Sequence, residues 1–282
     1  MTPALTFSAR ALGYPRAAPV LCDFSFTVQA GQTLALLGGN GAGKTTILKS
    51  IVGLLKGTEA VSEVHGVKLT RSPADAVKAG MGLVFQNPDE QLFCSTVLED
   101  VLYGPRNLGL SEQEAHERGN AAIECLGISH LVDRPIEALS FGEKKRVCLA
   151  AVLAMKPSIL LLDEPTAGLD PQCELSFLKI LEQLSRTMNV ALIVATHAVD
   201  LVPYFADRVM LLGERQVLAE GTPHDVFDRG EDLLRARVRA PWVAQLWRTV
   251  HRNGEVSLPC ALTVEEAARR WKKEQNVAVC EG

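Results

Sequence analysis

One glycine-rich octapeptide constrains this chain more than any other feature. Residues 38–45 read Gly-Gly-Asn-Gly-Ala-Gly-Lys-Thr and match the pattern G-x-x-x-x-G-K-[ST] at every fixed position. The apolar run 33–37 precedes the octapeptide, and Ile47, Leu48 and Ile51 follow it at helical spacing. The octapeptide therefore lies between a predicted strand and a predicted helix, which is the context in which this pattern forms a phosphate-binding loop.

The octapeptide predicts a nucleotide site built largely from backbone groups. Glycines allow backbone N–H groups to turn inward around phosphates, and the N-terminus of the following helix adds partial positive charge. Lys44 is expected to reach the β- and γ-phosphates, and the Thr45 hydroxyl is expected to ligate Mg²⁺. A glycine-rich turn without a ligand would explain the glycines but not the Lys-Thr pair that follows them.

Composition excludes several classes of protein. No apolar run approaches the eighteen or more residues of a membrane span, and residues 1–5 resemble no part of a signal peptide. The net charge of −4 gives no sign of a broad nucleic-acid-binding surface. Seven scattered cysteines without Cys-x-x-Cys spacing argue against a disulfide framework or a zinc site. We therefore expect a cytoplasmic protein whose membrane role, if any, comes through a partner.

The hydrophobic pattern predicts an α/β protein with a helical insertion. The runs 159–162 and 190–195 are apolar without alternation, as in strands of a parallel sheet, and a helix over 172–187 would complete a β-α-β unit. Residues 21–28 alternate as in a half-buried antiparallel strand. The remaining expected strands are 4–9, 82–85, 208–212 and 216–219. The expected inserted helices are 96–103, 111–126 and 142–155, the first of which should end at Gly104-Pro105.

Chemically informative residues follow two of these strands. Asp163 and Glu164 come directly after 159–162, and in phosphate-loop proteins such acids hold Mg²⁺ and polarise an attacking water. Acids are common at strand ends, so this pair is strong evidence only because a complete phosphate loop lies on another strand. His197 follows the strand 190–195 by two residues, and a histidine there is more often structural than catalytic when taken alone.

Residues 139–143, Leu-Ser-Phe-Gly-Glu, open a predicted helix. Ser140 and Glu143 have the spacing of a capping box, which is a purely structural reading. A helix N-terminus that carries serine and glycine is also a good anion site. The two readings are compatible, because a capped helix can still point its end at a phosphate.

The order of these motifs resembles that of the ATP-binding cassette (ABC) ATPases over residues 1 to about 222. The phosphate loop, Gln86, the signature 139–143, the acids 163–164, the segment Ala167 to Asp170 and His197 occur in the order of that family. The resemblance implies a P-loop NTPase fold with an antiparallel β subdomain and a helical subdomain. It also implies a head-to-tail dimer of two copies that encloses two ATP molecules between phosphate loops and opposite signature helices.

The resemblance assigns roles to individual residues. Tyr14 is implied to stack on adenine, Glu164 to act as general base and His197 to act as a γ-phosphate switch. Gln86 is implied to touch Mg²⁺ and the attacking water and to sense a membrane partner. The phosphate-loop residues implied to bind ATP are Gly39, Asn40, Gly41, Ala42, Gly43, Lys44, Thr45 and Thr46. The residues implied to hold Mg²⁺ are Thr45, Gln86 and Asp163. The residues implied to act across the dimer interface are Ser140, Gly142, Glu143 and Asp170.

A narrower resemblance leads to energy-coupling-factor importers, and within them to the cobalt and nickel subgroup. It is carried by residues 85–93, 99–101, 104–109, 142–147 and 163–171, and by Pro241-Trp242. It implies an ATPase that energises cobalt import from the cytoplasmic face of the membrane, with nickel or another small substrate as the alternative. The implied partners are a transmembrane scaffold subunit, contacted around Gln86 to Val101, and substrate-binding membrane subunits.

Three positions depart from the ABC pattern, and at one of them Glu143 replaces the usual glutamine. Phe141 occupies the place of a signature glycine, which is tolerated only if its ring points away from the nucleotide. Ala198 follows the switch histidine where an acid is common, and Asp200 is not assumed to replace that acid. None of these departures removes a residue needed for hydrolysis.

The expected organisation is an ATP-binding domain over 1–222, a helical subdomain over about 89–157 inserted in a RecA-like core, and a helical appendage over 223–282. The appendage holds all three tryptophans, and Thr263 with Glu266 would cap its last helix. Each tryptophan could close a local core, whereas the resemblance implies an appendage that joins two ATPase subunits.

A soluble ABC ATPase without a transport role is the other reading of this sequence. ABC proteins of DNA repair carry long coiled coils between the phosphate loop and the acidic strand, whereas this interval shows no sustained heptads. Ribosome-associated forms generally carry two cassettes, and this chain has one. We therefore expect no nucleic-acid partner. A nucleotide-dependent switch without transport is a third, weaker reading, and co-purification with small membrane proteins would separate these classes.

Overall fold

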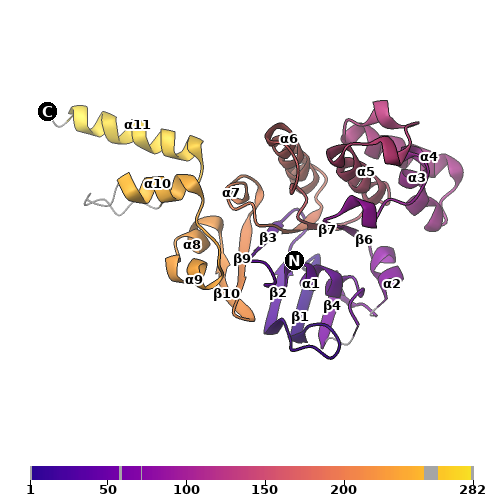
Figure 1. Ribbon diagram of the computed structural model, residues 1–282, viewed down its shortest axis with the longest axis horizontal. Helices are drawn as coiled ribbons and strands as arrows, with labels where there is room; N and C mark the ends of the chain where they lie inside the picture. The colour runs from indigo at the N-terminus through magenta and orange to yellow at the C-terminus, as the bar shows by residue number, and fades with distance from the viewer. Residues whose placement is uncertain (1, 57–58, 71, 251–259, 281–282) are drawn as a thin grey trace.

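A six-stranded sheet forms the centre of the molecule (Figure 1). The computed structural model describes residues 2–56, 59–70, 72–250 and 260–280. The strand order is β10-β9-β3-β8-β7-β6, and all neighbours pair in parallel except β10, which is antiparallel to β9. The strands are β3 (Thr33–Leu37), β6 (Met81–Val84), β7 (Ile159–Asp163), β8 (Ala191–Ala195), β9 (Arg208–Gly213) and β10 (Gln216–Gly221).

The interior strands of this sheet are covered on both faces. Every residue of β3, β7 and β8 is buried, which explains why these segments are apolar without alternation. The helices between and around the strands are α1 (Lys44–Ile51), α2 (Pro73–Lys78), α6 (Pro171–Glu182) with a π-helical extension (Gln183–Thr187), and α7 (Val202–Phe205). The predicted parallel core, its β-α-β unit and the closing hairpin are confirmed.

A second, antiparallel sheet packs beside the first in the order β2-β1-β4-β5. Its strands are β1 (Leu5–Leu12), β2 (Leu21–Val28), β4 (Ala60–Val64) and β5 (Val67–Lys68). The ring of Phe7 on β1 lies 5.8 Å from that of Phe24 and 5.6 Å from that of Phe26 on β2, centroid to centroid. This apolar face shares one core with α1 and one face of the central sheet. The expected antiparallel β subdomain is therefore present.

Three helices gather at one end of the molecule, between β6 and β7 in sequence (Figure 1). They are α3 (Val97–Asn107), α4 (Glu112–Cys125) and α5 (Phe141–Leu153), and short 3₁₀ turns lie at Pro88–Glu90, Ser129–Leu131 and Ile136–Ala138. A capping box fixes the start of each of the three helices, with Thr96, Ser111 and Ser140 as the N-cap residues.

The expected end of the first of these helices is wrong. Helix α3 runs through Gly104 and Pro105 to Asn107. Gly104 allows α3 to lie close to the end of α5, where a Cβ at this position would come within 2.8 Å of the Met155 side chain. Pro105 lies close to the end of the helix and removes only one backbone donor. The close packing outweighs the weak helix propensity of the two residues.

The C-terminal segment forms a group of helices on the far side of β9 and β10 (Figure 1). They are α8 (Pro223–Phe227), α9 (Gly230–Arg235), α10 (Trp242–Val250) and α11 (Val264–Cys280). Trp247 is buried in a core shared with β9, whereas Trp242 and Trp271 are exposed, so only one tryptophan closes the local core. The Thr263 hydroxyl accepts a hydrogen bond from the Glu266 N–H at 3.2 Å, which confirms the predicted cap.

Among the described residues, no helix combines the length and the apolar character that crossing a bilayer requires.

Candidate nucleotide-binding site

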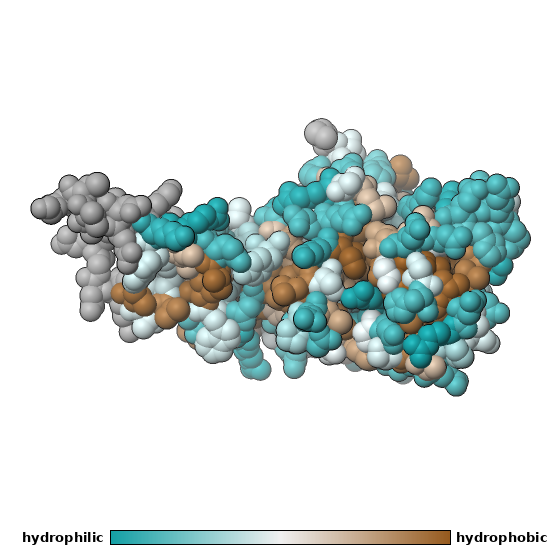
Figure 2. Space-filling model, turned by 90° about the horizontal axis from the view of Figure 1, so that it is seen from above, coloured by the Kyte–Doolittle hydropathy of each residue, from teal (hydrophilic) through white to brown (hydrophobic). Residues whose placement is uncertain are grey.

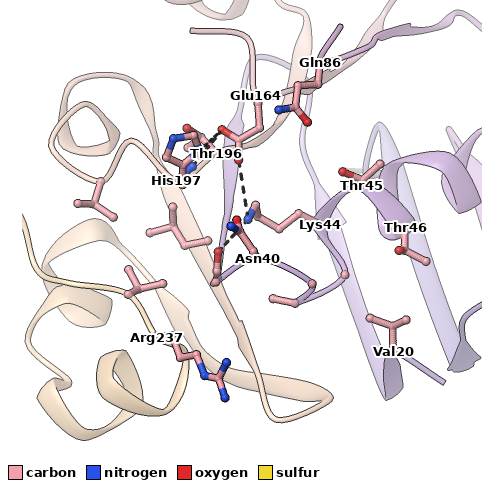
Figure 3. A pocket seen from close by; sticks show the side chains of 18 of the residues that line it. Val20, Asn40, Lys44, Thr45, Thr46, Gln86, Glu164, Thr196, His197 and Arg237 are labelled. Carbon is pink, nitrogen blue, oxygen red and sulfur yellow. Dashed lines mark hydrogen bonds and ion pairs between the residues drawn. The ribbon is translucent and has the colours of Figure 1, made fainter. Parts of the chain in front are cut away.

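A pocket of about 830 Å³ opens at the carboxyl ends of four neighbouring parallel strands (Figure 3). Strand β3 leads into the phosphate loop, β6 leads to Gln86, β7 to Glu164, and β8 to Thr196 and His197. Open α/β sheets bind ligands at this edge, because strand ends and helix N-termini meet there. The sheet therefore brings four segments that are far apart in sequence to one cavity.

The phosphate loop takes a conformation that needs glycine. Gly43 has φ 102°, and a Cβ on it would lie 2.9 Å from side-chain atoms of Val20 and Leu21. No side chain caps α1, which begins at Lys44, so the first N–H groups of this helix are available to a ligand. The Lys44 ammonium is buried, donates to the Gly38 carbonyl at 2.8 Å and lies 3.8 Å from Glu164 Oε1.

Glu164 is held in a strained and tightly bounded position. Its backbone has φ 47°, a left-handed conformation that is uncommon outside glycine and typical of functional sites. Its Oε2 lies 2.8 Å from His197 Nδ1 and accepts a hydrogen bond from the His197 backbone N–H at 3.2 Å. The carboxylate is therefore buried between Lys44 and His197, as the dashed contacts in Figure 3 show.

Asp163 presents a buried oxygen that no protein group satisfies. Its Oδ1 has no hydrogen-bond partner, and burial raises the pKa of this carboxyl while a hydrogen bond from the Thr45 hydroxyl opposes that rise. An unpartnered buried carboxylate oxygen needs a cation or an ordered water. The Thr45 hydroxyl bonds to Asp163, and Thr45 and Gln86 both line the pocket, so these three residues offer oxygen donors of the kind that Mg²⁺ prefers. The donor set therefore fits Mg²⁺.

Within the part of the chain that the structure describes, no three His, Cys, Asp or Glu side chains cluster so as to hold a metal ion.

The signature residues do not line this pocket. Ser140 and Glu143 form the expected capping box: the Glu143 carboxylate accepts from the Ser140 N–H and hydroxyl, both at 2.7 Å. Asp170 caps α6 by accepting from the N–H groups of Gln172 and Cys173. Ser140 and Asp170 are exposed, and Gly142 is half-buried. Their local structural roles are thus met within one chain, and their outward faces remain accessible.

Phe141 turns toward its own chain. A Cβ on Gly168 would lie 3.0 Å from the Phe141 ring, so the ring covers the segment after β7, and Phe141 is not among the residues of the pocket. Asp200 pairs with Arg239 and accepts from the Trp242 N–H at 2.7 Å, so Asp200 is engaged with the C-terminal segment and does not replace the acid absent at Ala198.

Sequence reasoning missed one wall of the pocket. Arg237, Val238 and Arg239 line it together with the expected Tyr14 and phosphate loop, and Figure 3 shows the Arg237 side chain on the side opposite Thr46. The Gly39 N–H donates to the Ala236 carbonyl at 2.9 Å, which ties this segment to the phosphate loop. No motif marks residues 236–239, since their position follows only from how α9 packs against β9.

Comparison with known proteins agrees with this geometry. The sequence profile of the ABC transporter family matches residues 21–167. The chain is 39% identical over 258 residues to the energy-coupling factor transporter ATP-binding protein EcfA of Methanocaldococcus jannaschii, covering 91% of this chain and 92% of that protein. EcfA of Methanothermobacter thermautotrophicus is 41% identical over 255 residues, covering 90% of this chain and 81% of that protein.

A solved structure supports the same conclusion. The structure of cbiO1 from Clostridium perfringens matches this chain with a TM-score of 0.74 and 34% sequence identity. The match covers 90% of this chain and 96% of cbiO1, which is part of the ABC transporter complex cbiONQ. The family profile includes β3, β6 and β7 of the pocket, and β8 lies beyond its last matched residue. The chain therefore belongs to the ABC transporter ATPases, and among them to the ATP-binding proteins of energy-coupling-factor transporters.

Proposed function

We propose that this ATPase energises the import of cobalt ions through an energy-coupling-factor membrane transporter. The observation that supports this most directly is the division of the site: the residues for hydrolysis share one pocket, while the signature residues face away from it. A chain built this way needs a second copy to complete the site, and conformational change in such a dimer can drive a membrane partner.

The proposed reaction is hydrolysis of ATP to ADP and phosphate. Glu164 accepts a proton from water while the water oxygen bonds to the γ-phosphorus and the bridging oxygen leaves with ADP. Lys44 and the loop N–H groups hold the β- and γ-phosphates, and His197, whose side chain contacts Glu164, contacts the γ-phosphate. Mg²⁺, when bound by Thr45, Gln86 and Asp163, neutralises charge on the β- and γ-phosphates. Tyr14 stacks on the adenine.

The second half of each site comes from another copy. Ser140 and Gly142 at the start of α5 are placed against the γ-phosphate bound by the partner's phosphate loop, with Glu143 holding the helix start in shape. Gly142 and the first N–H groups of α5 supply an anion-binding helix terminus. Asp170 lies at the interface between the two copies.

A groove next to Gln86 supports docking of a transmembrane scaffold subunit. The groove has a volume of about 490 Å³, lies among α2, β6, α3 and α5, and is mostly apolar. Phe93 and Tyr103 on its rim are exposed, and their rings meet edge to face at 4.6 Å. Exposed apolar surface of this kind marks interaction sites. Gln86 lies in sequence between Phe85 and Gln91, which line the groove, and it lines the ATP pocket, so a partner in the groove would sense the nucleotide.

The C-terminal helices offer a surface for pairing two ATPase subunits. Trp242, Leu246 and Val250 are spaced four residues apart on α10 and are exposed by 63%, 65% and 53%. Figure 2 shows apolar residues gathered at this end of the molecule. A second copy of the chain is the occupant that continues the proposed ATP dimer. With this role, residues 223–282 form an appendage to the ATP-binding domain 1–222, in which 89–157 is the helical subdomain.

Cobalt is the substrate we propose, because the motif resemblance and the likeness to cbiO1 agree on it. Nickel is the alternative, and a soluble ATPase without a membrane partner is the other outcome. As part of a cobalt importer, the protein acts at the cytoplasmic face of the membrane and is attached through its membrane partners. It has no nucleic-acid partner in this role.

Replacing Glu164 with glutamine tests the assignment of the general base. The amide keeps the shape of the side chain but cannot accept the proton, so turnover should fall by about 10² to 10⁴-fold. ATP binding should persist, and size-exclusion chromatography with ATP and Mg²⁺ should show stable dimers. Unchanged turnover would refute the role of Glu164, and loss of ATP binding would mean that the residue holds the nucleotide.

Leu246→Asp tests pairing through α10. A buried carboxylate at the centre of an interface should raise the dissociation constant of the nucleotide-free dimer by about tenfold or more. Sedimentation in the analytical ultracentrifuge over a series of protein concentrations measures this constant. Val67→Asp is the matched control, since Val67 is equally exposed on β5, away from the appendage. Equal dimerisation of the two variants would rule out this surface.

Uptake of radioactive cobalt and nickel by cells or vesicles that hold this ATPase with its native membrane partners tests the substrate. ATP-dependent uptake of cobalt, abolished by Glu164→Gln, is the expected result. Uptake of nickel alone would replace cobalt with nickel. If no small membrane proteins co-purify with the chain and neither metal is taken up, the proposed role in transport is wrong.

A further inference from the structure

A buried lysine connects the signature helix to the catalytic glutamate of the same chain. Lys145 on α5 is only 3% exposed. Its Nζ donates to the Glu164 carbonyl at 2.7 Å and to the Pro165 carbonyl at 3.2 Å, and it lies 5.3 Å from the centre of the Phe141 ring. Burial lowers the pKa of Lys145 to about 8, and the attraction of Glu164 for the ammonium opposes this shift. A buried ammonium is costly unless its donors are satisfied, and here they converge on two consecutive peptides.

The neighbouring lysine shows that this arrangement is specific. Lys144 forms a salt bridge to Asp89 at the surface, with 2.7 Å between Nζ and Oδ1. The structure records no contact between Lys144 and Asp163 or Glu164. The two lysines are adjacent in sequence and identical in chemistry, yet they point to different sides of α5. Replacing either lysine with glutamine removes one positive charge from α5, but only Lys145 contacts Glu164.

The peptide of Glu164 is fixed from both sides. Its N–H donates to the Ala195 carbonyl of β8 at 2.8 Å, and its carbonyl accepts from Lys145. The residue sits at φ 47°, a conformation that persists only where surrounding contacts enforce it. Since φ and ψ of Glu164 set the direction of its carboxylate, a shift of either contact redirects that carboxylate relative to a bound water.

Helix α5 also carries the residues proposed to contact the other ATP. Ser140 caps the start of α5, and Lys145 follows five residues later, within about one and a half helical turns. A short stretch of α-helix moves as one body. Displacement of the start of α5 by a nucleotide would therefore be transmitted to Lys145 and to the peptide of Glu164.

We propose that Lys145 is a positioning residue that couples the two ATP sites of the dimer. It ties the signature end of α5, which contacts ATP held by the partner copy, to the backbone of Glu164, which hydrolyses ATP held by its own chain. ATP at one site thereby aligns the base at the other, and the coupling is reciprocal because both copies are alike. This inference rests on the proposed dimer and on the proposed role of Glu164.

The test compares Lys145→Gln with Lys144→Gln as the matched control. Glutamine is neutral and too short to reach both carbonyls, so in Lys145→Gln we expect kcat to fall by about 10- to 100-fold. The Hill coefficient for ATP should fall toward 1, while the Kd for ATP stays within about twofold. Lys145→Arg keeps the charge and the donors and should recover part of kcat. Lys144→Gln should retain the kcat and the Hill coefficient of the unmodified protein.

Mixed dimers separate positioning from general destabilisation. Two differently tagged copies are co-purified, one of them carrying Glu164→Gln so that a single site hydrolyses ATP. Lys145→Gln in the copy with intact Glu164 should lower turnover by about tenfold or more, and in the copy with Glu164→Gln by much less. Equal losses in the two arrangements would indicate a merely structural lysine and overturn the proposal.

Two further outcomes contradict the proposal in distinguishable ways. If Glu164→Gln forms no dimer with ATP, the proposed function fails and the coupling fails with it. If that dimer forms but Lys145→Gln keeps the kcat and the Hill coefficient of the unmodified protein, only the coupling is wrong. If Lys145→Gln does not fold, Lys145→Arg decides: a Hill coefficient below that of Lys144→Gln supports the coupling, and a Hill coefficient equal to it contradicts the coupling.

Discussion

The buried carboxylate of Glu164 is the group on which the rest of the site depends. It lies between the Lys44 ammonium and the His197 ring, at the end of a strand that is buried along its whole length. A carboxylate is stable at such depth only with these two partners, and the three groups follow three different strands. The parallel register of β3, β8 and β7 is therefore what makes the chemistry available.

The same chain carries the other half of the site on a different face. The capping box of Ser140 and Glu143 satisfies the start of α5 internally, so the helix end is stable without a ligand and is free to receive one. Lys145 connects this outward-facing end to the peptide of Glu164. The molecule can thus be described as two half-sites joined by one helix, which accounts for both the dimer and the communication within it.

Much of this arrangement could be predicted from local sequence. The phosphate loop, the buried strands and the capping boxes depend on neighbouring residues, so their patterns were sufficient. Arg237 and Lys145 could not be predicted, because their positions depend on packing between segments far apart in sequence. Pro105 was misjudged for the same reason, since the fit of Gly104 against Met155 decides where α3 ends. The roles of the individual site residues stay predictions.

Complementation between two inactive variants tests the shared site most directly. Lys44→Ala disables the phosphate loop and Ser140→Arg disables the signature, so each variant alone should hydrolyse almost no ATP. A mixed dimer contains one site built from the intact phosphate loop of one copy and the intact signature of the other. The account predicts that mixing the two purified variants restores ATPase activity above that of either one. If mixing restores nothing while each variant still folds and dimerises, the site is not shared between two copies.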